Sequence, residues 1–396
     1  MSNATPEPLP DPTGPHAIGR VSYEWVDQDR AEIYSADAED RRELVVWVWY
    51  PAAAEASARR AEYLPVSWAP NAQFLGLEVD GVRAHAVEEA PLAGGETKYP
   101  VLLMSISGFP PLLHSSLAEE LASHGYVVVG VNHTYESTVT VFSDGRVVAM
   151  NPQAVAGALG PQSGNHDEAF RARAEVCMLK AADLAFVAGQ VGLLDADAAG
   201  RFGGRLDLSR MGAFGVSFGG NAALEWCRTD PRGRAAVNLD GALWTDVGKV
   251  GLERPALQVL AEHEEFAVSP EKAVQTGMAP DAEWFVAEKA ITVGGWRTVH
   301  ERSRPGYTVR VAGATHLSFL DIPLLPRKGD AMVTGMLAAT TIGAERMWRI
   351  ISDLVLAFFD KHLGNGDGDG DGDGDGDGGI LDGPDPAYPE LAYGPA

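Results

Sequence analysis

Apolar runs with the length of buried strands alternate along the chain with segments whose apolar residues recur every three or four positions. The apolar runs are Leu44–Tyr50, Val101–Ser105, Tyr126–Val131, Met211–Phe214, Ala235–Leu239, Ala256–Leu260 and Tyr307–Val311. The helical pattern covers Ser116–His124, Phe170–Val191, Asn221–Arg228 and Met347–Phe359. Strands that alternate with helices build a mostly parallel central sheet with helices on both faces, so we expect an α/β fold.

Local signals predict where some of these elements begin and end. Ser116 and Glu119 have the spacing of a capping box, and the helix that they open is expected to end at His124, because Gly125 follows. Residues Asp207–Arg210 are predicted to form a turn in front of the next strand.

The chain is predicted to hold one large domain. Its 396 residues are 45% hydrophobic, which is enough for a sizeable core. We expect this domain to cover residues 1–363, with the Pro- and Gly-rich residues 1–20 extended over its surface. Residues 266–305 are predicted to be a lid-like insertion before the last strand, and their aromatic side chains are expected to pack in the core.

A Gly-Asp tract at residues 364–379 is predicted to link the domain to a tail at residues 380–396. The tract has no apolar side chain to bury, so a flexible linker is favoured. A calcium loop is the alternative, although flanking helices are missing and the twelfth position is Asp instead of Glu. The residues that imitate such a loop are Asp371, Asp373, Asp375, Gly376 and Asp382.

The net charge of −24 argues against nucleic acid and anionic membrane surfaces as partners. No uninterrupted apolar run approaches the ~18 residues of a membrane span. The N-terminus has neither the basic nor the apolar region of a signal peptide, so we expect a cytoplasmic protein, or a secreted one if the N-terminus has been trimmed. Cys177 and Cys227 are predicted to be buried free thiols, and no spacing indicates a metal or cofactor site.

The pentapeptide Gly215–Gly219 has the pattern of a nucleophile elbow, in which a serine occupies a sharp turn between a strand and a helix. The two glycines leave room for the strained backbone of Ser217, whose hydroxyl is thereby exposed above the sheet. The amide of Phe218 lies at the start of the helix, where it can donate to an oxyanion.

A serine nucleophile needs a base, which in this class of fold follows the serine and the acid along the chain. His316 fits, because it comes after the strand that ends at Val311 and a turn of small residues. His300 lies in the insertion, and His362 is expected to stabilise a helix end by its charge. His114, His124 and His133 all precede the serine and are expected to be local hydrogen-bonding residues, and of these three only His133 is a candidate to line the pocket.

Two places compete for the acid that orients the base. Asp240 ends the strand Ala235–Leu239, whereas Glu262, Glu264 and Glu265 follow the next strand. Local chemistry favours neither place strongly.

A second oxyanion donor is expected from the loop that follows Val101–Ser105. The backbone amide of Phe109 is the preferred candidate and that of Gly108 the alternative. Pro110 and Pro111 have no amide to donate.

With these residues placed, the chain resembles the serine-dependent platelet-activating factor acetylhydrolase family, in its bacterial branch. The similar segments are Leu9–Pro15, Val48–Pro51, Leu121–Val128, Asn132–His133, Val216–Gly220 and Leu239–Gly241. Leu121–Val128 is very similar to the family's Leu-Ala-Ser-His-Gly block, and Val216–Gly220 resembles its His-Ser-Phe-Gly-Gly nucleophile motif.

The resemblance implies an α/β-hydrolase fold and a triad of Ser217, Asp240 and His316, with Phe109 as the second oxyanion donor. Two residues depart from the family pattern: Val216 and Ser107 each stand where a histidine is usual. These departures leave the triad intact but bear on the preference for acyl chain and headgroup.

The expected function is therefore hydrolysis of short-acyl esters, including phospholipids, through an acyl-enzyme and without a metal or organic cofactor. A dienelactone-hydrolase-like or polyester-cleaving, cutinase-like esterase of the same fold is the alternative, in which Glu262 or Glu264 would be the acid. A binding module without catalysis is a third possibility, although such proteins commonly lose a triad member. The oligomeric state cannot be predicted.

Overall fold

The fold was analysed in a computed structural model, which describes residues 9–55, 58–156, 166–328, 334–335, 337–364 and 379–395. Residues 1–8 of the predicted N-terminal extension lie outside the described residues. So does the repeat of the Gly-Asp tract, together with the calcium alternative for it.

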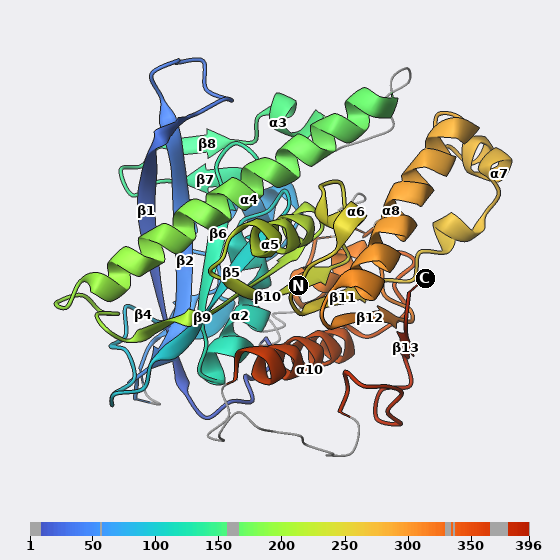
Figure 1. The fold of residues 1–396 in the computed structure, drawn as a ribbon. Helices are drawn as coiled ribbons and strands as arrows, with labels where there is room; N and C mark the ends of the chain where they lie inside the picture. The colour runs from blue at the N-terminus through green and yellow to red at the C-terminus, as the bar shows by residue number, and fades with distance from the viewer. Residues whose placement is uncertain are drawn as a thin grey trace.

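An 11-stranded sheet runs through the molecule in the order β13-β12-β11-β10-β9-β5-β6-β2-β1-β4-β3, and β7 and β8 pair separately (Figure 1). The strands are β1 (Ala17–Ala31), β2 (Arg41–Ala52), β3 (Arg60–Glu62), β4 (Arg83–Glu88), β5 (Tyr99–Ile106), β6 (Val127–His133), β7 (Val139–Val141), β8 (Val147–Ala149), β9 (Leu206–Val216), β10 (Gly233–Leu239), β11 (Ala256–Leu260), β12 (Gly306–Val311) and β13 (Leu391–Tyr393). In the sheet, the block β12-β11-β10-β9-β5-β6 is parallel throughout. At its two ends, β2 pairs antiparallel with β6 and β13 pairs antiparallel with β12. All predicted strands are present.

Helices cover both faces of the sheet (Figure 1). They are α1 (Ala69–Phe74), α2 (Ser115–Ser123), α3 (Pro152–Ala156), α4 (His166–Ala196), α5 (Phe218–Thr229), α6 (Val247–Val250), α7 (Pro270–Gln275), α8 (Ala282–Arg302) and α10 (Ala344–Leu363), with short 3₁₀ helices η1 (Val66–Trp68), η2 (Pro111–His114), η3 (Glu264–Ala267), η4 (His316–Phe319) and η5 (Ile322–Leu324). Alternate residues of each strand face opposite layers: Phe214 belongs to the buried cluster that includes residues of α2 and α10, and Ala213 to the one that includes residues of α4, α5 and α8. This arrangement is that of an α/β-hydrolase fold.

Three predicted boundaries are wrong. Ala17–Arg20 belong to β1, so the N-terminal extension stops before them. Asp207–Arg210 form no separate turn, because they lie within β9, where the pairing with β5 shifts between Pro100 and Val101. The strand β12 is not the last one, because β13 pairs with it from the C-terminal tail.

The predicted capping box at the start of α2 is also absent. The Ser116 hydroxyl donates to Asp321, and Glu119 accepts the backbone N–H groups of His85 and Ala86 at 3.0 Å each. These contacts to distant segments replace the local capping bonds, because they satisfy buried polar groups that would otherwise have no partner.

The segment 266–305 contains α7 and α8. Trp296 and Val299 of α8 are buried against the sheet, so this part of the segment is the helix that connects β11 to β12. Trp284 and Phe285 are buried too, as expected for core aromatics.

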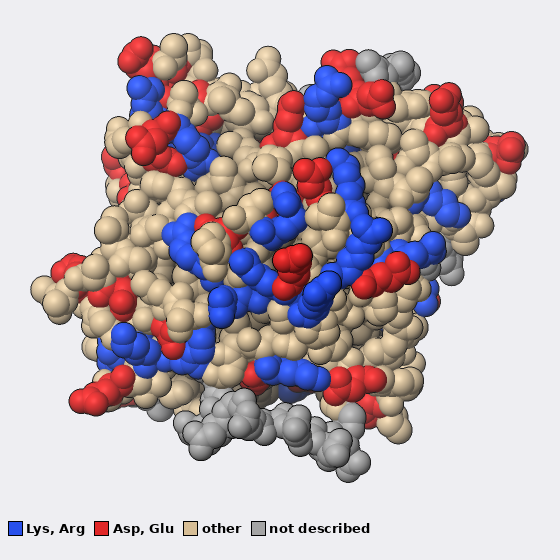
Figure 2. Space-filling model, in the orientation of Figure 1, with Lys and Arg blue, Asp and Glu red and all other residues tan. Residues whose placement is uncertain are grey.

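α4 is the one helix in the described part of the chain that is long and apolar enough to cross a membrane. Half of its most apolar window is buried inside the protein, and the buried core helix of a water-soluble protein meets the same criterion. On the face in Figure 2, basic side chains gather near the centre, in front of α5 and α6, with acidic ones among and around them. The excess of negative charge is therefore not spread evenly.

Candidate active site

Ser217 occupies the predicted turn between β9 and α5. Its backbone has φ 61° and ψ −127°, a conformation that costs a non-glycine residue on the order of 1–3 kcal/mol. The neighbouring glycines make this turn possible: a Cβ at Gly219 would lie 2.1 Å from the carbonyl oxygen of Ser105, and one at Gly215 would lie 2.4 Å from Gly219. The structure thus has the strained elbow that the pentapeptide predicts, with the serine half-buried at the carboxyl end of β9.

Asp240 lies beside this elbow, directly after β10. The amide of Ser217 donates to Leu239 at 2.9 Å, and a Cβ at Gly241 would lie 2.1 Å from the Ser217 carbonyl oxygen. The carboxylate is buried, and its Oδ1 accepts the amide of Ala261 at 2.7 Å. Asp240 is therefore fixed at the same edge of the sheet as Ser217.

His316 reaches Asp240 from the loop that follows β12. Its Nδ1 lies 2.7 Å from Oδ2 of Asp240, and its side chain is 46% exposed. Because the ionised carboxylate can only accept, Nδ1 carries a proton, which in the neutral ring leaves the lone pair on Nε2. Among the described contacts Ser217 and His316 form no hydrogen bond, but such bonds are often long in a free enzyme and tighten in the complex.

Sequence reasoning missed His263, a second histidine on the same carboxylate. Its Nε2 lies 2.8 Å from Oδ1 of Asp240, and its ring packs against Trp296 with the ring centres 4.8 Å apart. Burial alone would raise the pKa of Asp240, but the charges and hydrogen bonds of His263 and His316 outweigh it and hold that pKa well below its usual range. His263 could have been found from its position directly after β11, a region that was considered only as a source of the acid.

The competing acids are placed differently. The Glu262 carboxylate accepts the backbone N–H of Gly313 at 2.8 Å and is exposed. The side chains of Glu264 and Glu265 lie outside the described residues. Of the acids whose side chains are described, Asp240 is therefore the one that His316 contacts.

The two predicted oxyanion donors come from different elements. Phe218 is the first residue of α5, so its amide is one of those that have no acceptor within the helix. Gly108, at φ 73°, turns the loop after β5, and its carbonyl oxygen accepts the amide of Thr138 at 2.9 Å. In a trans peptide the C=O and the following N–H point in opposite directions, so the Phe109 amide points away from Thr138.

The remaining histidines differ from expectation in two cases. His133 does not line the pocket, because it is fully buried behind the loop that follows β5. His362 does not act as a cation, because burial, followed by the charge of Lys361, lowers its pKa to about 4. His124 pairs with Glu120, and His300 lies in α8.

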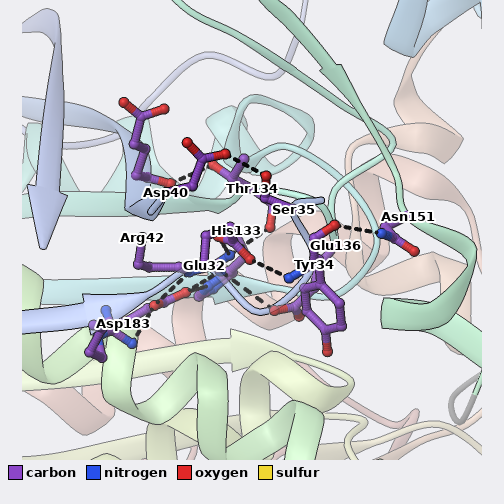
Figure 3. A network of polar contacts seen from close by, with 12 residues as sticks. Glu32, Tyr34, Ser35, Asp40, Arg42, His133, Thr134, Glu136, Asn151 and Asp183 are labelled. Atoms are coloured by element: carbon purple, nitrogen blue, oxygen red, sulfur yellow. Dashed lines mark hydrogen bonds and ion pairs between the residues drawn. The ribbon is translucent and has the colours of Figure 1, made fainter. Parts of the chain in front are cut away.

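Within the described residues, one group of side chains has the spacing of a metal site. Ligand atoms of His133, Glu136 and Asp183 lie within 4.8 Å of one another. Arg42 already pairs with Asp183 (Figure 3), and Lys180 pairs with Glu136, so cationic side chains already compensate these carboxylates and the group does not suit a metal ion.

Comparisons with known proteins agree with this picture. Residues 5–379 match the family described as platelet-activating factor acetylhydrolase, isoform II. The chain is 26% identical over 264 residues to a probable 1-alkyl-2-acetylglycerophosphocholine esterase of Arthroderma benhamiae, covering 62% of this chain and 61% of that protein. It is 26% identical over 304 residues to a platelet-activating factor acetylhydrolase of Cavia porcellus, covering 74% and 64%. The alignments thus span just under two thirds of each relative.

A solved structure of similar fold is a ferulic acid esterase from Streptomyces cinnamoneus. The TM-score is 0.71 at 26% identity, and the match covers 98% of this chain and 99% of the other.

Proposed function

Since the chain belongs to the platelet-activating factor acetylhydrolase, isoform II, family, we propose that it is a carboxylester hydrolase with Ser217 as its nucleophile. The observation that carries the proposal is the strained serine at the end of β9, next to the Asp240–His316 pair. The esterases among its relatives and structural neighbours support the same reaction class.

In the proposed mechanism, His316 Nε2 takes the proton of the Ser217 hydroxyl as its oxygen attacks the ester carbonyl. Asp240 holds the imidazole in the required tautomer and stabilises the imidazolium that forms. The amides of Phe218 and Phe109 donate to the oxyanion of the tetrahedral intermediate, where one such donor is typically worth about 3 kcal/mol. His316 then protonates the leaving alcohol, and water hydrolyses the acyl-enzyme by the same route in reverse.

We propose short-acyl esters as the substrate class, with sn-2 acetyl phospholipids among them. The names of the two relatives support this choice. The ferulic acid esterase supports a second candidate, an ester of an aromatic acid, because its structure matches almost the whole chain. A panel of p-nitrophenyl esters from acetyl to octanoyl, an sn-2 acetyl phospholipid and methyl ferulate would rank the two by kcat/KM.

The reaction itself is tested with p-nitrophenyl acetate. We expect Ser217→Ala to lower kcat by about six orders of magnitude and Asp240→Asn by about four. Glu262→Gln, the matched control on the competing acid, should retain kcat within about threefold. A fluorophosphonate probe should label the wild type and not Ser217→Ala. If Ser217→Ala hydrolyses the ester at the wild-type rate, the proposal is wrong.

A further inference from the structure

A second Ser-His-Asp arrangement lies behind the loop that carries Phe109. His133 Nδ1 lies 2.8 Å from Oδ2 of Asp183, and its Nε2 lies 2.8 Å from the Ser105 hydroxyl. All three residues are fully buried. Because Asp183 can only accept, Nδ1 carries the proton and Ser105 donates to Nε2. Without access to solvent, this arrangement cannot act on a substrate, so its role must be sought in what it holds.

Charged side chains surround this arrangement, among them Arg42, Glu32 and Glu136 (Figure 3). Asp183 pairs with Arg42 at 2.7 Å and with Arg30 at 2.8 Å, and Arg42 also pairs with Glu32 at 2.9 Å. Lys180 of α4 pairs with Glu136 at 2.8 Å. Burial, followed by the charge of Lys180, lowers the pKa of His133, so this ring stays neutral. Each of the three cations of this cluster, Arg30, Arg42 and Lys180, is therefore paired with at least one carboxylate.

The cluster reaches the loop 106–109 through the carbonyl oxygens of the loop. Lys180 Nζ donates to the oxygen of Ile106 at 3.3 Å. The segment after His133 supplies two more donors: the Thr138 amide bonds Gly108 at 2.9 Å, and the Ser137 hydroxyl bonds Phe109 at 3.3 Å. That segment is itself fixed, because the amides of Glu136 and Ser137 both donate to the His133 carbonyl at 3.0 Å.

These bonds determine where the loop's amides point. Because the Ile106 and Gly108 carbonyls are held towards the cluster, the amides that follow them, of Ser107 and Phe109, point the other way, whereas Pro110 after Phe109 has no N–H. The elbow is tied to the same place, since the Ser105 carbonyl oxygen packs against Gly215 and Gly219. The Asp183–His133 pair therefore acts on Ser105, beside the elbow that carries Ser217. The donors to the loop carbonyls act on the segment that carries the Phe109 amide.

We propose that Lys180, Glu136 and the Asp183–His133–Ser105 relay are positioning residues that hold loop 106–109 with the Phe109 amide directed at the oxyanion. This inference rests on the proposed function, because an oxyanion forms only if Ser217 attacks an ester. The inference predicts that substitutions within this cluster lower the rate of the chemical step but leave the titration of the proposed base, His316, unchanged.

The test replaces the Lys180–Glu136 pair by Lys180→Met/Glu136→Leu, which leaves no lone charge behind. We expect kcat for p-nitrophenyl acetate to fall about 10- to 100-fold with KM within about threefold, since removing an oxyanion donor outright typically costs 10²–10³-fold. The pH dependence of kcat/KM should keep its shape, because Asp240 and His316 are untouched. Discrimination between this ester and its thionoester, which replaces the oxyanion by sulfur, should weaken by a similar factor.

A matched control removes another buried cation that binds carbonyl oxygens and a carboxylate. Arg20 bonds the carbonyls of Glu62 and Tyr63 and pairs with Glu88, far along the sheet on β1. Arg20→Met/Glu88→Gln should lose stability comparably but keep kcat within about twofold. The milder Ser137→Ala removes the single hydroxyl that donates to the Phe109 carbonyl of the loop and should lower kcat about two- to fivefold, which keeps the test informative if the double variant does not fold.

The outcomes separate the inference from the function beneath it. If Ser217→Ala remains active, the proposed function fails. If Ser217 is required but the folded Lys180/Glu136 variant and Ser137→Ala keep wild-type kcat and thionoester discrimination, the positioning role is overturned. It is also overturned if the Arg20/Glu88 control loses kcat equally, since the effect would then follow from lost stability.

Discussion

Asp240 binds two imidazole rings with one carboxylate, His316 on Oδ2 and His263 on Oδ1. Both rings line one cavity, but only His316 follows β12, after the serine and the acid in chain order, where the base of this fold class is expected. His263 packs against Trp296 and, with Glu262 and Arg310, lines a second cavity. We therefore interpret His263 as a group that fixes the carboxylate rather than one that takes a proton from the serine.

This interpretation predicts a graded response at His263. His263→Gln can still donate a hydrogen bond to Oδ1, so kcat for p-nitrophenyl acetate should stay within about threefold. His263→Leu removes that donor and leaves Oδ1 with the amide of Ala261 alone, so kcat should fall about tenfold. Steady-state kinetics of both variants beside Asp240→Asn provide the check. A loss with His263→Leu as large as that with Asp240→Asn would instead make His263 an essential base.

At the scale of elements, the site depends on how closely α5 approaches β5. A Cβ at Gly219 would lie 2.1 Å from the Ser105 carbonyl oxygen, and backbone cannot yield as a flexible side chain does. Gly219→Ala should therefore push α5 from the sheet, lower the free energy of unfolding by about 2 kcal/mol or more and abolish esterase activity.

Gly294, in the middle of α8, is the matched control for that substitution. Nothing lies within 4 Å of the Cβ that Gly294→Ala would add, so this variant should keep full activity and gain up to about 1 kcal/mol of stability. Urea unfolding and p-nitrophenyl acetate hydrolysis measure both effects. If Gly219→Ala keeps the activity and the unfolding free energy that Gly294→Ala keeps, the site does not depend on the close contact between α5 and β5.

At the scale of the whole molecule, the sequence predicted the parallel block of the sheet because each buried strand has its own apolar run. β1 was missed because only continuous apolar runs were taken as strands, although its alternation of polar and apolar residues is typical of a half-buried strand, and β13 is too short to give a pattern. Ser217, Asp240 and the base His316 could be located because turn chemistry and chain order constrain them. His263 and the cluster around His133 could not, because their partners are distant in the chain and only the fold brings them together.

Buried neutral histidines also make the stability of the whole molecule depend on pH. Burial lowers the pKa of His114 to about 3, and both of its ring nitrogens are buried without a hydrogen-bond partner. The unfolded chain binds a proton at this residue below about pH 6.5 and the folded chain does not, so stability is full above pH 6.5 and falls as the pH drops towards 3. His114 alone should remove about 2 kcal/mol of unfolding free energy between pH 7 and pH 5.

Substitution of His114 by leucine separates this contribution from those of other groups. His114→Leu loses no hydrogen bond, so it should retain most of its stability at pH 7 while its unfolding free energy declines less steeply on acidification. Urea unfolding at intervals from pH 7 to pH 4 measures the difference. Curves for the variant and the wild type that remain parallel over this range would contradict a neutral His114 in the folded core. If the two unfolding free energies are similar at pH 7 and the variant is the more stable protein below pH 6, His114 is one site at which acid destabilises the fold.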